Sequence, residues 1–294
     1  MSGGVLLSAE VSTALAEHRP VVALETSIVG QGLPPPYNLR AARDCEAAIR
    51  SEGAVPATLA VIDGRLRAGL SDEDLERIAA GATKVSSRDL GPALVRRSLG
   101  ATTVAATMRI ASMVGIRFLA TGGIGGVHRG HPEDVSADLE ELGRTPVAVF
   151  CAGAKIILDL SSTLERLDSL AVPVLGFGTS VFPAFYTKQS EGRVSARVDS
   201  AQEAAEMIHA AWSSGSRGIV VAVPPPTDLE GAQEIADQAV LELTGVAGGE
   251  VTPKLLARMA ELSDGRSVAL NVSLVVNNAS IAARVARAFA HLPA

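Results

Sequence analysis

The chain has 294 residues, of which 47% are hydrophobic, 3% are aromatic and 20% are charged, and its net charge is −6. The negative charge, the lack of a long basic run and the few aromatic residues argue against a nucleic-acid polymer as a partner. With so few aromatic residues, the core must be built from Ala, Val, Leu and Ile. Such aliphatic runs suit strands that are buried on both faces of a sheet.

The N-terminal sequence MSGGVLLSAEVS lacks the charged region and the long apolar stretch of a signal peptide, so we expect a cytoplasmic protein. We expect no membrane partner either, because the apolar runs are shorter than the ~20 residues that span a bilayer. Cys45 and Cys151 form no CxxC pair and are expected to be reduced thiols in the core.

Apolar segments of β-type alternate with helical patterns along the chain. The predicted strands are residues 21–29, 58–62, 83–86, 116–121, 146–151, 172–177 and 218–223. The predicted helices are residues 39–51, a helix after the cap residue Ser71, residues 204–212 after the capping box of Ser200 and Glu203, a helix that starts at Thr252-Pro253, and residues 271–289.

This alternation predicts an α/β fold, a three-layer α/β/α sandwich with a mixed, mainly parallel central sheet. Residues 190–199 alternate in polarity and are expected to form an antiparallel edge or hairpin strand. No change in composition marks a second domain, so residues 1–294 are expected to form a single one. The proline-rich loops 33–36 and 224–226 each follow a strand, at the sheet edge where such folds bind ligands.

Glu25 ends the apolar run Val21–Leu24. A charged carboxylate in such a place costs several kcal/mol unless it is paired or hydrogen-bonded. It is either a strand-end residue, solvated or paired with an arginine, or a general acid whose proton affinity is adjusted by burial.

Lys155 is one of four lysines in the chain and stands between a predicted buried strand and an apolar segment that we expect to begin a helix. Burial and the helix dipole would both favour its neutral amine, the form that makes a Schiff base. The alternative is a lysine whose stem is buried and whose amine reaches water.

Two small-residue segments are candidates for ligand contact. Residues 121–130 (TGGIGGVHRG) carry glycines after a strand, where backbone amides can approach a ligand, and His128 and Arg129 could hold an anion or a polar base. The segment lacks the GxGxxG and P-loop patterns. Residues 100–104 (GATTV) precede a helix and predict either a phosphate site or simple capping by threonine.

Two further segments carry charged residues. Residues 133–138 (EDVSAD) could bind Mg²⁺ or Mn²⁺ through oxygen atoms, or their acidic residues could cap the next helix. Residues 83–89 (TKVSSRD) place the scarce Lys84 at the end of a short β-type segment, where it is either functional or an ordinary surface residue.

Taken in order, nine segments between Pro20 and Phe289 resemble the pseudouridine-5′-phosphate glycosidase family, also known as indigoidine synthase A-like proteins. They are VALETSIVGQGLPPPYN, GAVPATLAVIDG, KVSSRDL, GATTVAATM, ATGGIGGVHRG, DVSADL, CAGAKIILDL, TPKLLARMAEL and LVVNNA. Each segment alone is a weak signal, but nine in the same order are highly specific.

The resemblance implies a role for individual residues. Glu25 matches the proton donor and Lys155 the lysine that becomes covalently joined to the sugar. Asp134 matches the aspartate that binds one divalent cation per subunit, usually Mn²⁺. The positions that match or are expected to make substrate contacts are Lys84, Val104, Ser136, Ala137, Asp138, Thr121, His128 and Asn271. A homotrimer is also implied.

The resemblance further implies an enzyme that reversibly cleaves the carbon–carbon bond between uracil and ribose 5-phosphate, in pseudouridine breakdown. A carboxylic acid and a neutral lysine in one pocket suit such a reaction through a ring-opened sugar held as a Schiff base. The alternatives are a lyase for another C-nucleotide and a phosphosugar-binding protein without catalysis. A ribokinase-like sugar kinase is disfavoured because its ATP-binding pattern is missing.

Overall fold

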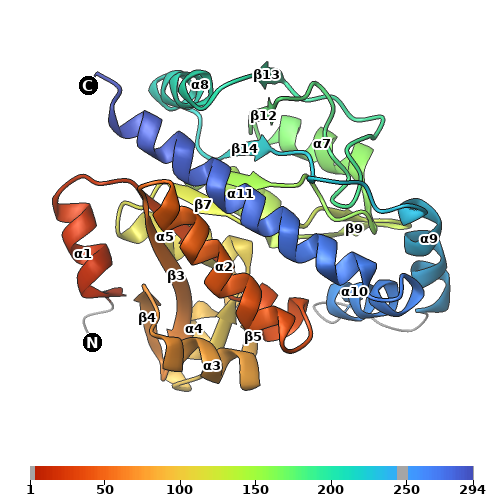
Figure 1. Cartoon of the computed structure of the whole chain (residues 1–294), viewed down its shortest axis with the longest axis horizontal. Coiled ribbons are helices and arrows are strands. Elements are labelled where there is room, and N and C mark those ends of the chain that lie inside the picture. The colour runs from red at the N-terminus through yellow and green to blue at the C-terminus, as the bar shows by residue number, and fades with distance from the viewer. Residues whose placement is uncertain (1–3, 244–250, 294) are drawn as a thin grey trace.

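The computed structural model describes residues 4–243 and 251–293 (Figure 1). Its main sheet runs in the order β1 (Leu6–Leu7), β4 (Arg65–Ala68), β3 (Val55–Ile62), β2 (Val21–Leu24), β7 (Phe118–Ala120), β10 (Ala148–Cys151), β14 (Ile219–Ala222), β12 (Val174–Phe177) and β13 (Ala196–Val198). Two more strands, β5 (Thr83–Val85) and β6 (Gly100–Thr102), join it through β3. A small second sheet contains β11 (Leu158–Asp159), β8 (Val127–His128) and β9 (His131–Val135).

The main sheet is mixed and mostly parallel, as predicted. Neighbouring strands from β3 to β13 run parallel, whereas β3 pairs antiparallel with β4 and β6. All residues of β2, β10 and β14 are buried, which agrees with their uninterrupted apolar sequences. Burial on both faces requires a helical layer on each side of the sheet.

The chain winds in opposite directions from the centre of the sheet. It passes from β2 to β3 through α2 (Tyr37–Ser51), and from β7 to β10, on the other side of β2, through α6 (Ala137–Leu142). Since such crossovers are right-handed, α2 and α6 lie on opposite faces. The long helix α11 (Arg266–Ala290) packs between α2 and α8 (Ala201–Ser213), and α5 (Val104–Met113) packs beside α6 (Figure 1). The result is the predicted α/β/α arrangement.

The remaining helices lie around this frame. They are α1 (Ala9–Ala16), α3 (Asp72–Ala80), α4 (Leu90–Val95), α7 (Leu160–Ser169), α9 (Ala232–Glu242) and α10 (Val251–Leu262). The cap predicted at Ser71 is present, and Ser71 forms a capping box with Asp74. At Ser200 the side chain accepts from the Glu203 amide, as predicted, but the Glu203 carboxylate accepts from the Asp199 amide.

Four details of the chain differ from the prediction. The segment 196–198 is at the sheet edge as expected, but it pairs parallel with β12, since the chain crosses over before it pairs. The first strand ends at Leu24, and residues 28–32 form a π-helical turn. Thr252 lies inside α10, which already includes Val251, so it does not cap the helix. The short strands β4 and β6 were missed because three or four residues carry almost no periodic signal.

Helix α11 is long and apolar enough to cross a membrane by length and composition alone. It is instead a core helix, since 67% of its most apolar window is buried inside the protein. Its apolar residues meet α2, α8 and the central strands. Cys45 and Cys151 are both buried free thiols.

Candidate active site

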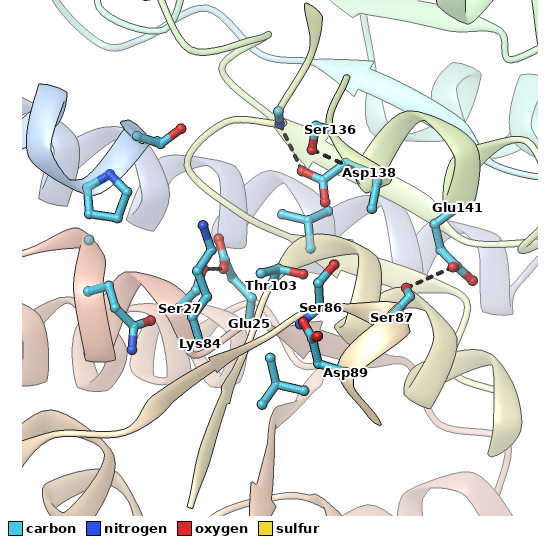
Figure 2. A pocket seen from close by; sticks show the side chains of 18 of the residues that line it. Glu25, Ser27, Lys84, Ser86, Ser87, Asp89, Thr103, Ser136, Asp138 and Glu141 are labelled. Carbon is cyan, nitrogen blue, oxygen red and sulfur yellow. Dashed lines mark hydrogen bonds between the residues drawn. The ribbon is translucent and has the colours of Figure 1, made fainter. Parts of the chain in front are cut away.

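Three adjacent parallel strands end at one level of the sheet and place the site. Leu24 of β2 pairs with Ala120 of β7, and Ala120 in turn is level with Phe150 of β10. Glu25, Thr121 and the loop that begins at Ala152 therefore leave the sheet side by side. A cavity of about 910 Å³ opens at this edge, where open α/β sheets bind ligands (Figure 2).

Glu25 lies at the inner end of the cavity and is held by two hydroxyl groups. Thr121 Oγ1 donates a hydrogen bond of 2.6 Å to Glu25 Oε1, and Ser27 Oγ donates to Oε2. Ser27 follows Glu25 by two residues, whereas Thr121 comes from the end of the neighbouring strand β7. Each carboxyl oxygen thus has its own donor, which fixes the plane of the group.

The pKa of Glu25 is raised above its ordinary value, chiefly because burial disfavours the charged form. The positive charge of Lys155 and the hydrogen bonds from Ser27 and Thr121 oppose this rise, while the negative charge of Asp138 adds to it. Desolvation is the largest effect, so Glu25 holds its proton to a higher pH than an exposed glutamate. A carboxyl group with that property can donate a proton near neutral pH.

Removal of the Thr121 hydroxyl tests this balance. Thr121→Val keeps the shape but removes a donor that favours the carboxylate, so the pKa of Glu25 rises further. If the enzyme needs protonated Glu25, activity is lost as pH rises through that pKa, and the alkaline limb of the pH–rate profile should move to higher pH. Hydrogen bonds to charged groups are worth about 1.5–3 kcal/mol, enough for a clear shift.

The measurement is kcat/KM against pH for wild type, Thr121→Val and the control Thr187→Val. The Thr187 hydroxyl donates to the carbonyl of Gln189 and not to Glu25, so its removal should leave the pH–rate profile unchanged. An unmoved alkaline limb in Thr121→Val would show that Glu25 does not control it.

Lys155 lies in the loop between β10 and β11 and lines the cavity. The expectation that it begins a helix is wrong, since α7 starts at Leu160, beyond β11. The loop is instead joined to the glycine-rich segment, because the Lys155 amide donates to the carbonyl of Ile124 over 3.2 Å. The helix dipole therefore has no role at this lysine, and packing between two loops sets its position.

Both carboxyl oxygens of Asp138 accept hydrogen bonds from backbone amides. Its Oδ1 accepts from the amide of Ala105 over 2.9 Å and its Oδ2 from the amide of Gly125 over 2.8 Å. The residue is 5% exposed and ties the first turn of α5 to the glycine-rich loop. Gly125 allows this close approach, since a Cβ there would lie 2.2 Å from Ser136 Oγ.

In the segment 100–104, the hydroxyl group of Thr103 also binds a backbone amide. Thr103 is the N-cap of α5 and accepts from the amide of Ala106, so the capping interpretation holds. Together with Asp138 it occupies two amides of the first turn. Ser136 plays the matching part for α6, where its hydroxyl accepts from the amide of Asp138. An acidic residue does not cap this helix.

The other predicted contact residues surround the same cavity. Those that line it are Lys84 on β5, Val104 at the start of α5, Ser136, Ala137 and Asp138 around the start of α6, His128 on β8, Asp134 on β9 and Asn271 on α11. Thr121 is 1% exposed and lies behind Glu25 rather than at the cavity wall. Ten of the eleven predicted site residues therefore border one space.

His128 and Asp134 both line the cavity, and the charge of Asp134 affects the pKa of His128. Burial lowers the pKa of His128, and the positive charges of Lys155, His131 and Lys84 add to this, while the charge of Asp134 opposes it. His128 is therefore neutral at neutral pH. Among the described residues, no group of three or more His, Cys, Asp or Glu side chains is arranged to hold a metal ion.

Asn271 presents an unused acceptor at the cavity. The residue is 4% exposed, and its Oδ1 has no hydrogen-bond partner in the described part of the chain. This oxygen lies beside Gly122, where a Cβ would approach it to 3.3 Å. A ligand with an N–H or O–H group could satisfy it.

Three features of the site escaped the sequence analysis. Ser27 holds Glu25, and its signal was a hydroxyl two residues after a strand-end carboxylate. Phe185 lines the cavity and has a left-handed backbone conformation (φ 61°), which no sequence pattern predicts. At the far end of the cavity, Ser87 donates to Glu141, which is also held by Arg109 through two hydrogen bonds (Figure 2).

The chain matches the family model of the indigoidine synthase A like proteins over residues 10–288. It is 48% identical over 299 residues to a pseudouridine-5′-phosphate glycosidase of Sorangium cellulosum (strain So ce56), covering 98% of this chain and 94% of that protein. It is 50% identical over 294 residues to a pseudouridine-5′-phosphate glycosidase of Symbiobacterium thermophilum, covering 94% and 95%.

Two solved structures share the fold over nearly the whole chain. The prealnumycin C-glycosynthase AlnA, determined in complex with ribulose 5-phosphate, superimposes with a TM-score of 0.87 at 36% identity, covering 99% of this chain and 98% of that one. An indigoidine synthase A-like protein of Thermotoga maritima superimposes with a TM-score of 0.89 at 30% identity, covering 96% of both chains.

Proposed function

The chain belongs to the indigoidine synthase A-like protein family, and on that premise we propose that it is a pseudouridine-5′-phosphate glycosidase. In this proposal the enzyme reversibly cleaves the carbon–carbon bond of pseudouridine 5′-phosphate and yields uracil and ribose 5-phosphate. The relatives of that name match 98% and 94% of the chain, and a structural neighbour was solved with a five-carbon phosphosugar, ribulose 5-phosphate.

The observation that carries the proposal is the pairing of Glu25 with Lys155. Both line one cavity, and the lysine is close enough for its charge to lower the pKa of the carboxyl group. A non-catalytic phosphosugar-binding site has no need for a buried carboxyl group beside an amine. A carbon leaving group, in contrast, requires an acid and a nucleophile together, because carbon departs with difficulty from an intact sugar ring.

The bond changes follow from these two groups. Glu25 gives its proton to the ring oxygen as the ribose ring opens, and the electrons of uracil complete a conjugated system that reaches the first sugar carbon. The neutral amine of Lys155 adds to that carbon. The added nitrogen then loses a proton and C5 of uracil gains one, so that the nitrogen lone pair can expel uracil and leave the sugar as an iminium on Lys155. Water hydrolyses the iminium, freeing ribose 5-phosphate and the amine.

The other cavity residues orient the substrate in this scheme. Lys84, Val104 and the segment 136–138 are proposed to contact the phosphosugar, with His128 beside it. The free Oδ1 of Asn271 is suited to accept from an N–H of uracil. Thr121 acts on Glu25 rather than on the substrate.

Asp134 is proposed to hold one Mn²⁺ ion per subunit. A single carboxylate on the cavity wall fits an ion that keeps most of its water ligands. Such an ion would supply positive charge near the substrate phosphate. The carboxyl group of Asp134 would hold the ion, and burial of His128 favours its uncharged form, which would not repel a cation there.

The metal proposal predicts that Asp134→Asn weakens Mn²⁺ binding by about 10-fold or more, since even outer ligands contribute that much. Binding is measured by the electron paramagnetic resonance signal of free Mn²⁺, with ribose 5-phosphate present. Glu133→Gln is the matched control, because Glu133 is a neighbouring carboxylate on β9 whose side chain is 75% exposed. Equal Mn²⁺ affinity in wild type and Asp134→Asn would exclude Asp134 as the ligand.

We further propose a cytoplasmic homotrimer that acts in pseudouridine breakdown. The family resemblance and the two buried free thiols support these proposals. Sedimentation velocity tests the oligomeric state, and a species with the mass of one or two chains would contradict the trimer.

The proposed function is tested by incubation of the purified protein with pseudouridine 5′-phosphate and Mn²⁺. Chromatography should show uracil and ribose 5-phosphate appearing in equal amounts. Uridine 5′-phosphate, which has a carbon–nitrogen bond, is the matched control and should remain intact. If pseudouridine 5′-phosphate binds but is not cleaved, the chain is a binding protein and the proposal is wrong.

A further inference from the structure

Arg129 belongs to the glycine-rich segment 121–130, but it is not among the described residues that line the cavity. Its guanidinium group binds the loop that carries Lys155. Nε donates to the carbonyl of Leu158 over 3.0 Å, and Nη2 donates to the carbonyl of Ile156. Nη1 donates to Asp237 Oδ1 of α9 over 2.7 Å. One side chain therefore joins the lysine loop to α9, whose Asp237 lies 108 residues from Arg129 in sequence.

The two carbonyls belong to the turn that begins at Lys155. The carbonyl of Lys155 accepts from the amide of Leu158 over 2.9 Å, which closes the turn. Leu158 then pairs with His128, the residue before Arg129, in the antiparallel pair of β11 and β8. Arg129 thus binds the second and the last residue of a short turn whose first residue is the proposed nucleophile.

The start of the same loop is fixed by backbone contacts. Gly153 adopts a left-handed conformation (φ 78°) and lies so close to Pro183 that a Cβ would be 1.8 Å from the carbonyl oxygen of Pro183. Its own carbonyl accepts from the amide of Ile124 over 3.0 Å. Lys155 sits between this rigid start and the turn that Arg129 holds, so the position of its amine depends on both.

We propose that Arg129 is a positioning residue that fixes the turn from Lys155 to Leu158 and so holds the Lys155 amine at the sugar carbon. The inference rests on the proposed function and adds a residue that the reaction scheme does not use. The planar guanidinium group of Arg129 is required, because two carbonyls and a carboxylate must be reached at once. A lysine ammonium cannot reach all three in the same geometry. The Arg129 side chain is 30% exposed, so water competes only partly for these bonds.

The test compares Arg129→Lys and Arg129→Met with wild type. The rate constant for borohydride-trapped adduct formation with saturating ribose 5-phosphate reports directly on the reach of the amine. A misplacement of about 1 Å costs about 100-fold in rate, so we expect a fall of about that size in both variants. The sugar phosphate concentration for half-saturation should stay nearly unchanged, because Arg129 does not line the cavity.

Asp237→Asn is the matched control. It removes the ion pair of Arg129 with α9 but leaves both carbonyl contacts, and the Asp237 side chain is 51% exposed. Exposed ion pairs contribute little, so its trapping rate should remain within about threefold of wild type. An equal loss in Asp237→Asn and Arg129→Lys would assign the effect to the ion pair and overturn the proposal.

Amide hydrogen exchange is a second measurement, and it does not depend on whether the enzyme catalyses the proposed reaction. Peptides covering residues 153–160 should exchange faster in both Arg129 variants, while β10 stays protected. Folded variants that trap ribose 5-phosphate as fast as wild type would overturn the inference. If wild type itself forms no adduct, the proposed function fails, and the exchange data still decide whether Arg129 holds the loop. Should Arg129→Met not fold, Arg129→Lys, which keeps the stem and the charge, carries the test.

Discussion

The Lys155→Ala variant is expected to release no measurable uracil from pseudouridine 5′-phosphate, a loss of about 10⁴-fold or more, as for other enzymes that lose their nucleophile. The reason is chemical rather than structural. Without the amine there is no group to add to the first sugar carbon and no nitrogen lone pair to expel uracil. Intact-protein mass after borohydride reduction with ribose 5-phosphate should show one added sugar phosphate on wild type and none on the variant.

The matched control for this experiment is Lys254→Ala. Lys254 is an exposed lysine on α10, outside the set of described residues that line the cavity. With only four lysines in the chain, the adduct is easily assigned by peptide mapping. Near wild-type turnover by Lys155→Ala would exclude the covalent scheme, and an adduct on Lys84 instead would make Lys84 the nucleophile.

Glu25→Gln is expected to lower kcat by about 10²- to 10⁴-fold, the usual worth of a general acid. Glutamine keeps the shape of the side chain but has no acidic proton for the ring oxygen. Single-turnover release of uracil measures the effect on the chemical steps. The loss should be largest on the acidic side of the profile, where Glu25 of the wild type is protonated and active.

The same variant also changes the pH dependence of stability. Burial raises the pKa of Glu25 in the folded state, so between the ordinary and the raised value the folded protein binds more protons than the unfolded chain. The free energy of unfolding of the wild type therefore falls as pH rises through this interval. Glu25→Gln lacks this loss, so urea denaturation should show the variant gaining stability relative to wild type as pH rises.

Glu191→Gln serves as the control, since Glu191 is an exposed glutamate outside the cavity. A Glu25→Gln enzyme that releases uracil at the wild-type rate would remove Glu25 from the reaction. A stability difference that does not change with pH would contradict the burial argument without touching the catalytic role.

The positions of Glu25 and Lys155 explain why the two groups are useful together. The charge of Lys155 lowers the pKa of Glu25, but burial of the carboxyl group is the largest influence and disfavours its anion. A protonated carboxyl group avoids the cost of a buried charge. That protonation state is also the one that the proposed reaction needs.

The sequence alone determined the class of fold and most of the candidate site. Alternation of aliphatic strands with helices requires a covered, mainly parallel sheet, because each strand is apolar on both sides. The anomalies that pointed to chemistry were local: Glu25 at the end of an apolar run, and the scarce lysines Lys84 and Lys155. Local anomalies are visible in sequence because burial of a charge is costly wherever the chain passes through the core.

Only the tertiary structure decided how these residues meet. Apart from Ser27, the partners of Glu25, Asp138 and Arg129 come from distant segments or from backbone groups, and no pattern within one segment contains them. The same limit explains the error at Lys155, where an apolar run looked like a helix but forms a loop and a short strand. Backbone amides and carbonyls have no side-chain identity, so contacts to them from distant segments leave no sequence signal, and the folded arrangement alone places them.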